Sequence, residues 1–191
     1  GGKFVLDTGK IWFNSASQDG GGVYLNSGNF ELDYGKISHN TASKNGGGVY
    51  LIGDNCTYKL ENGDILKNTA KLGGGVYLAK GSFILADDES DTGNIQGNCS
   101  TENGGGVYIA GSGSFTMNGG LIEGNGRDTV YNQITTQDGG GVYLSGGKLT
   151  INAGSIKANA VSNNGGGAYI NGGALDVTSG YIQSNTANKD G

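Results

Sequence analysis

Apolar and polar residues alternate in short runs along the whole chain. Three short runs recur in a fixed order. The first is Val-Tyr-Leu or a close variant, and the second has the form Φ-x-Ψ, in which Φ is aromatic or apolar and Ψ is Leu, Met, Ile or Val. The third is a single Ile, usually with polar residues on both sides. In the first set that contains all three, they occupy residues 23–25, 30–32 and 36–38. A period of two is typical of β-strands, and no segment has the spacing of an amphipathic helix. The pattern predicts an all-β chain built from very short strands.

This set of runs is a repeat. The Gly-Gly-Gly strings that precede the Val-Tyr-Leu runs start 26, 27, 31, 35 and 26 residues apart. A Gly-x-Ile-x-x-Asn sequence ends each unit, and its asparagines are Asn14, Asn40, Asn68, Asn98, Asn125, Asn159 and Asn185. With a partial first copy and a fourth copy that contains an insertion, the chain holds seven units.

Strands of about three residues cannot form a sheet within one unit, so each is expected to pair in parallel with its equivalent in the next. The prediction is a right-handed, single-stranded parallel β-helix (solenoid) of about seven coils with three short strands per coil, roughly 34 Å long. Residues 1–191 are expected to form one domain, a fragment of a longer array, because neither end resembles a capping unit. Loop insertions are expected near residues 86–92 and 126–138, at different corners.

Alternation also orients the side chains. The residues expected to point inward, into columns of like residues, are Val23, Leu25, Phe30, Leu32 and Ile37. Those expected to point outward are Tyr24, Glu31, Lys36 and Ser38. The repeated asparagines fall at the corner after the third strand, where an internal ladder can bond the backbone of the neighbouring coil.

Glycine supplies 41 of the 191 residues, which would suit a disordered chain, but 35% of the residues are hydrophobic and ten are tyrosines. Collagen is excluded by the missing Gly-X-Y period. Proline is absent, as expected where interior strands need every N–H. The net charge of −5 and the single arginine, Arg127, argue against nucleic-acid binding. No apolar run is long enough for membrane insertion.

The glycine strings, together with the Ile-x-x-Asn-x-Ala sequences at residues 37–42, 65–70 and 182–187, resemble the repeats of bacterial surface β-helix proteins. The polymorphic outer-membrane adhesins are similar, although this chain has GGGVY where they have GGA-I. The resemblance covers essentially the whole chain. It implies a secreted or bacterial cell-surface segment, an adhesin or stalk involved in virulence, joined to flanking domains of a larger surface protein.

One candidate site is a column of outward tyrosines at the middle of each Val-Tyr-Leu run or its equivalent. Its members are Tyr24, Tyr50, Tyr77, Tyr108, Tyr143 and Tyr169. Stacked tyrosines would stabilise the rod through cross-strand pairing. Alternatively, an exposed aromatic strip about 24 Å long would bind a glycan or a host or partner protein.

A second candidate is an acidic corner after the second strand. Its members are Asp7, Glu31, Asp33, Glu61, Asp87, Asp88, Glu89 and Asp91. Stacked carboxylates repel one another, so a Ca²⁺ ion is the one possible cofactor; the alternative is a solvated face neutralised by Lys10, Lys36 and Lys59. No other cofactor is predicted.

A third interpretation is a carbohydrate-active enzyme, a polysaccharide lyase or glycosidase. Carboxylates about 5 Å apart suit a retaining mechanism, but stacking imposes that distance on any adjacent pair, so no catalytic residue is assigned. Cys56 and Cys99 lie at different corners and are expected to be free thiols. Trp12 and Phe13 occupy positions that are mostly polar or small elsewhere, and are expected to contact a preceding coil or to form a sugar platform.

Overall fold

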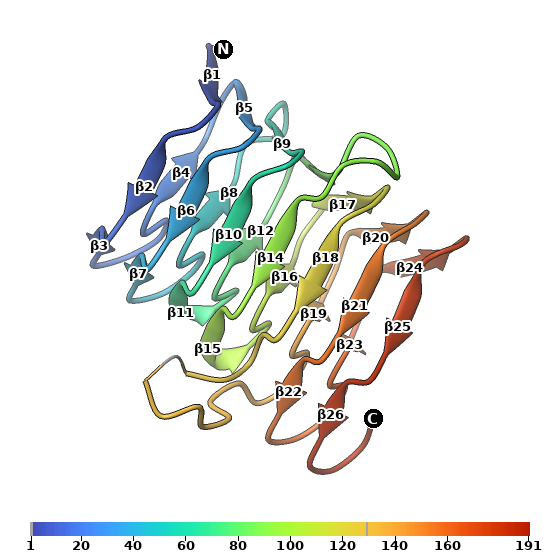
Figure 1. Cartoon of the computed structure of the whole chain (residues 1–191). Coiled ribbons are helices and arrows are strands. Elements are labelled where there is room, and N and C mark those ends of the chain that lie inside the picture. Colours follow the sequence, from blue (N-terminus) through green and yellow to red (C-terminus); the bar gives the residue numbers. More distant parts are fainter. Residues whose placement is uncertain (1, 129) are drawn as a thin grey trace.

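The structure, a computed structural model, describes residues 2–128 and 130–191, which wind into a parallel β-solenoid (Figure 1). The coils stack in chain order, so that the blue N-terminal coil and the red C-terminal coil lie at opposite ends. Each strand pairs in parallel with the strand one coil earlier or later, and each row of equivalent strands forms a sheet along the stack.

Sheet 1 contains the aromatic runs: β1 (Lys3–Leu6), β5 (Asn29–Leu32), β9 (Thr57–Leu60), β13 (Ser82–Leu85), β17 (Ser114–Met117), β20 (Lys148–Ile151) and β24 (Ala174–Val177). Sheet 2 contains the isolated isoleucines: β2 (Lys10–Trp12), β6 (Lys36–Ser38), β10 (Asp64–Leu66), β14 (Asn94–Gln96), β18 (Leu121–Glu123), β21 (Ser155–Lys157) and β25 (Tyr181–Gln183). Sheet 4 contains the Val-Tyr-Leu runs: β4 (Val23–Leu25), β8 (Val49–Leu51), β12 (Val76–Leu78), β16 (Val107–Ile109), β19 (Val142–Leu144) and β23 (Ala168–Ile170).

These three sheets are those that the repeat predicts, and a fourth row of strands was not predicted. Sheet 3 follows the repeated asparagines: β3 (Ser15–Ala16), β7 (Thr41–Ala42), β11 (Thr69–Leu72), β15 (Cys99–Asn103), then β22 (Ala160–Val161) and β26 (Thr186–Ala187). Most of these strands are too short to show alternation in the sequence. The long segment between β18 and β19, which contains the second insertion, separates the first four from the last two.

The core consists of columns of like side chains. Every inward position named above is buried except Leu25, which packs half-buried against the core. In sheet 1, register places Phe30 beside Tyr58 and Tyr58 beside Phe83. Their rings stack face to face at centroid distances of 4.8 and 4.7 Å, close to the spacing of adjacent strands. Like residues in register therefore fill the core as stacked columns.

The repeated asparagines form the predicted internal ladder. The backbone N–H and Nδ2 of Asn68 both donate to Oδ1 of Asn98 in the next coil, at 2.9 and 3.0 Å. The Asn68 Nδ2 also donates to the carbonyl of Ile37 in the preceding coil at 3.0 Å. The residue before each ladder asparagine, and not the asparagine itself, adopts the left-handed conformation, as at Lys67 with φ of 54°.

The glycine triplet has a separate reason at each position. Gly46 has a φ of +64°, which L side chains rarely adopt. A Cβ on Gly47 would collide with the carbonyl of Thr69, and one on Gly48 would lie 2.9 Å from Nδ2 of Asn68. The triplet thus turns the chain and then lets it pass against sheet 3 and the asparagine ladder.

Three smaller features complete the comparison with the sequence. Cys56 and Cys99 are free and buried, as predicted. Lys36 and Tyr24 are exposed as expected, but Ser38 is only 6% exposed because Trp12 and Leu66 on the paired strands flank its small side chain. The two longest segments between strands run from β13 to β14 and from β18 to β19, where the insertions were expected.

Candidate functional site

The tyrosine column lies in register along sheet 4, and its rings stack on one another. Centroid distances between successive rings run from 4.8 Å for Tyr108 and Tyr143 to 5.3 Å for Tyr50 and Tyr77. Parallel in-register pairing fixes this spacing, since each strand places its central residue directly above the one before. The stacking that the sequence predicts is therefore present from Tyr50 to Tyr169, and the ring of Tyr24 is tilted by 33° against Tyr50.

The column is much less exposed than simple alternation implies. Tyr24 is 53% exposed, but Tyr50 and Tyr143 are only 7% exposed, and the other three are half-buried. Burial raises the pKa of the Tyr77 hydroxyl to about 12, with smaller effects from Tyr108 and Tyr50. The column therefore exposes less aromatic surface than the sequence predicts, because neighbouring rings cover one another's faces. A ligand could reach mainly the ring edges and the hydroxyl groups.

Several carboxylates of the acidic corner have partners within the chain. Glu31 pairs with Lys3 at 2.6 Å and Asp87 pairs with Lys59 at 2.7 Å. The Nδ2 of Asn62 lies 3.3 Å from a carboxylate oxygen of Asp33 and 3.4 Å from one of Asp91. Asp7 lies exposed in the first coil. Lys59 is the predicted counter-charge that reaches a member of the cluster.

In the loop after β13, two carboxylates accept hydrogen bonds from groups of the same loop. Oδ1 of Asp88 accepts hydrogen bonds from the backbone N–H and hydroxyl of Ser90, which lower the pKa of Asp88. Asp91 accepts a hydrogen bond from the backbone N–H of Asp87 at 2.8 Å. Glu89 stays exposed. In the described part of the chain, no group of three or more His, Cys, Asp or Glu side chains is arranged to hold a metal ion.

Glu61 is a carboxylate of this corner whose pKa is raised. Burial contributes most, followed by the charges of Asp87, Glu31 and Asp33, while Lys59 acts in the opposite direction. A raised carboxyl pKa is a property that general acids share with crowded structural carboxylates. Glu61 therefore carries the strongest sign of unusual chemistry in the acidic corner.

The two insertions do not form a common cleft. The loop after β13, drawn in green, and the loop before β19, drawn in yellow to orange, project from opposite sides of the rod in Figure 1. The second loop is organised locally: Asp128 accepts hydrogen bonds from the backbone N–H groups of Val130, Tyr131 and Gln133. Arg127 donates to the carbonyl of Asn132, so it too has a partner within the loop.

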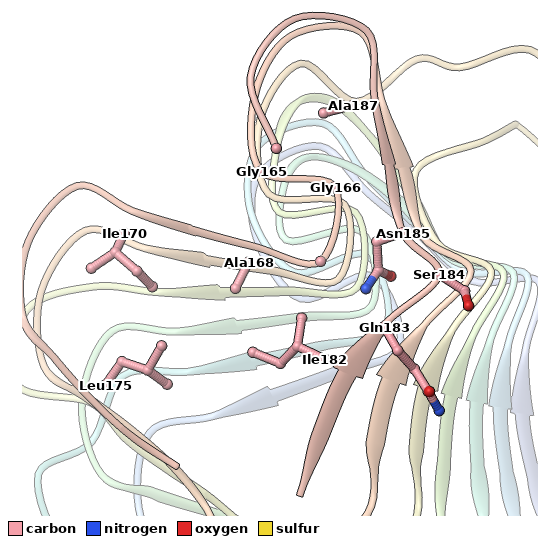
Figure 2. A pocket seen from close by; sticks show the side chains of 12 residues that line it. Gly165, Gly166, Ala168, Ile170, Leu175, Ile182, Gln183, Ser184, Asn185 and Ala187 are labelled. Atoms are coloured by element: carbon pink, nitrogen blue, oxygen red, sulfur yellow. The ribbon is translucent and has the colours of Figure 1, made fainter.

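Two of the hollows follow from the shape of the solenoid. Figure 2 shows one of about 370 Å³ at the last coil, where Ala168, Ile170, Leu175 and Ile182 end the core columns. Another of about 300 Å³ lies over glycines of the corner between sheets 1 and 2, with Glu89 and Tyr181 among its walls. Neither hollow contains a member of the tyrosine column.

Trp12 and Phe13 lie on the outside of the first coil and remain exposed. The ring of Phe13 stacks on His39 of the following coil at 4.9 Å. Sequence analysis singled out the two aromatic residues but not His39 as their neighbour. Phe13 and His39 each directly precede a ladder asparagine, and this shared position in the repeat predicts that they are neighbours in adjacent coils.

Residues 4–149 match a family model described as right handed beta helix region. This match gives the solenoid the right-handed winding that the sequence predicts. No curated protein and no solved structure matches the chain. The described residues include no helix that is both long enough and apolar enough to cross a bilayer.

Proposed function

Since the chain belongs to the right-handed β-helix family, we propose that it is a non-enzymatic repeat segment, an adhesin or stalk of a secreted or bacterial cell-surface protein. The observation that supports this function is the unbroken register of the three main sheets, in which like residues stack from coil to coil. Side chains that stack in columns present repeated surfaces rather than one converging site. Repeated weak contacts along such a surface gain strength through multivalency.

The tyrosine column is the first surface that such contacts would use. A glycan or a host or partner protein would bind at Tyr24, which is exposed, and along the reachable edges of Tyr77 and Tyr108. Flanking domains of a larger surface protein would hold the segment away from the cell. Nucleic acid is not among the proposed partners because the net charge is −5.

A glycan array and a binding screen against surface proteins test this use of the column. We expect binding by the native chain that weakens in the Tyr24→Ala variant and weakens further when Tyr77→Ala and Tyr108→Ala are added. Tyr34→Ala is the matched control, because Tyr34 is 61% exposed but lies outside the column. Binding that all these variants retain would refute the role of the column.

The raised pKa of Glu61 favours one second candidate, a glycosidase or lyase in which Glu61 is the general acid. An activity assay distinguishes this enzymatic candidate from the non-enzymatic proposal. The chain is incubated with neutral and uronate polysaccharides, and new reducing or unsaturated ends are detected. We expect no product from the native chain. Product formation that Glu61→Gln abolishes and Glu31→Gln retains would replace the non-enzymatic proposal.

A calcium-binding role at the acidic corner is tested separately. Burial raises the pKa of Glu61 most, and a cation there would relieve the smaller contribution from the neighbouring charges of Asp87, Glu31 and Asp33. If a cation binds there, calorimetric titration with Ca²⁺ gives heat that disappears in the Asp87→Asn, Asp88→Asn variant. An absence of heat from the native chain would leave the lysine pairs as the sole neutralising groups of this corner.

A further inference from the structure

An aromatic platform occupies the outer surface of the first two coils, formed by Trp12, Phe13 and His39. Trp12 and Phe13 are 56% and 67% exposed. The Trp12 and Phe13 rings lie 5.1 Å apart, and Phe13 stacks on His39 at 4.9 Å with an angle of 25° between the planes. Trp12 also flanks the small side chain of Ser38 on the paired strand. Large exposed aromatic rings that contact one another on a soluble surface are typical of binding sites.

The backbone beneath the platform is strained. Phe13, His39 and Lys67 hold φ angles of 53°, 55° and 54° in successive coils, in the left-handed region that disfavours large side chains. The equivalent residues of the other four coils are small: Gly97, Gly124, Ala158 and Ser184, with φ of 61°, 62°, 54° and 55°. Small residues thus occupy this corner elsewhere in the same solenoid. Three large side chains at the same corner indicate a demand from the surface, because the fold does not require them.

Two lysines flank the rings. Nζ of Lys10 lies over the Trp12 ring, 5.9 Å from its centre, and Lys67 follows His39 in the same column. Within residues 2–128 and 130–191, neither Lys10 nor Lys67 forms an ion pair. Lys36, by contrast, is bound to Asp64 at 2.8 Å, which neutralises that carboxylate. The platform therefore carries free positive charge on a chain whose net charge is −5.

We propose that this platform binds an acidic glycan, one whose sugar rings carry carboxylate or sulfate groups. The parts of the Trp12 and Phe13 rings that His39 and Lys10 leave exposed pack on the apolar faces of sugar rings, while Lys10 and Lys67 pair with the acidic groups. Charge complementarity selects this ligand over a neutral glycan, and the two coils of the platform, with Lys67 on the third, suit a short oligosaccharide. The proposal does not depend on the tyrosine column, which lies on a different sheet.

The chain offers a direct probe, since Trp12 is its only tryptophan. Titration of the native chain with tetragalacturonate or a heparin tetrasaccharide is expected to change Trp12 fluorescence saturably. Maltotetraose, a neutral tetramer, is expected to leave the fluorescence unchanged. Added salt is expected to weaken the binding, because exposed ion pairs are screened.

Variants separate the two parts of the platform, and calorimetry measures their binding. Lys10→Gln with Lys67→Gln is expected to lower the affinity about tenfold, the effect of losing two exposed ion pairs. Trp12→Ala with Phe13→Ala is expected to abolish binding, while Tyr181→Ala keeps it. Tyr181 is the matched control because it is 64% exposed on the same sheet at the far end of the rod.

Circular dichroism and urea unfolding confirm that each variant folds before its affinity is compared. Three results would overturn the proposal: no saturable signal from either acidic oligosaccharide, equal affinity for maltotetraose, or an unchanged affinity in the double lysine variant. A protein captured by the platform that glycans do not displace would identify a different class of partner and also refute it. Binding that Tyr24→Ala alone removes would locate the site on the tyrosine column instead.

Discussion

At the scale of single residues, one backbone position repeats a left-handed turn in every coil. The residue before each ladder asparagine has φ between 53° and 62°, whether it is Phe13, Lys67, Gly97 or Ala158. For an L residue this conformation costs about 1–2 kcal/mol, while glycine adopts it freely. The sequence predicts a corner here correctly, and the structure shows that the left-handed residue is the one before the asparagine. Hydrogen bonding by the asparagine side chain requires an inward direction, so the preceding residue takes the turn.

We expect Ala158→Gly to raise the free energy of unfolding by about 0.5–1 kcal/mol, because the relief of strain exceeds the added entropy of the unfolded chain. Ala158 is exposed, so the change removes little packing. Urea denaturation measures the effect. Ala174→Gly, an exposed alanine within β24, is the control and should lower the stability. A loss of stability in Ala158→Gly would contradict this account of the corner.

Tyr58 is a second residue with an unfavourable feature, a polar hydroxyl group buried in the apolar core. Its ring continues the stack of phenylalanines, but its hydroxyl is buried and has no hydrogen-bond partner among the described residues. Burial raises the pKa of this hydroxyl well above its usual value. An unpaired buried hydroxyl costs about 1–3 kcal/mol.

Tyr58→Phe is therefore expected to stabilise the chain by about 1–2 kcal/mol, with an unchanged fold, as measured by the urea midpoint. Tyr24→Phe provides the comparison, since the Tyr24 side chain is 53% exposed and should change stability little. Equal effects in the two variants would mean that the Tyr58 hydroxyl is solvated.

At the scale of elements, the asparagine ladder connects the coils at the corner between sheets 2 and 3. Asn40, Asn68, Asn98 and Asn125 are fully buried, and each donates to the next asparagine of the ladder. Buried amides with all partners present are stable, whereas the loss of one leaves several groups unpaired. The ladder therefore contributes most to stability when it is continuous.

Asn68→Ala is expected to cost about 3–5 kcal/mol, because the N–H and Nδ2 of Asn40 and the carbonyl of Ile37 lose their partner together. Thermal and urea unfolding measure the loss. In the control, Asn152→Ala removes an amide that is exposed and donates to Asn118 at 2.9 Å, and should cost less than about 1 kcal/mol. Similar costs at both positions would show that burial of the ladder is unimportant.

The elements also show where prediction from sequence succeeds. Val49, Phe30 and Ile37 alternate with outward residues, so three sheets and their inward faces follow from the pattern alone. Thr41–Ala42 is too short to have a pattern, and sheet 3 depends on contacts between coils. The burial of Tyr50 likewise depends on stacking against neighbouring rings, which alternation within one strand does not contain. The neutralisation of Asp87 by Lys59 joins residues in adjacent coils, and the sequence indicates a face neutralised by lysines without showing which pairs form.

At the scale of the whole molecule, each coil makes its main contacts with the coil before and the coil after it. Stability in such a solenoid is approximately a sum of terms for the units and their interfaces. Deletion of residues 46–72, from one glycine triplet to the next, joins Asn45 to Gly73 and is expected to leave a shorter folded solenoid. Its circular dichroism spectrum should remain that of a β protein. The slope of its unfolding free energy against urea concentration should decrease, because a shorter solenoid exposes less surface on unfolding.

Deletion of residues 46–58 removes half a unit and is the control. It places sheet 1 residues opposite sheet 4 residues, so the side-chain columns no longer match and the chain should unfold or aggregate. If both deletions gave equally stable proteins, in-register stacking would not be what specifies the fold.

The register of like residues has a consequence for how such a chain changes over generations. A duplicated unit carries both halves of the interface that it needs, since asparagine meets asparagine and tyrosine meets tyrosine at each step. Unequal recombination between copies can therefore lengthen or shorten the rod in steps of about 4.8 Å without creating a new interface. The length of the rod is then inherited as the number of repeat units. Single residues on the outer columns can change independently of that number and acquire separate binding partners.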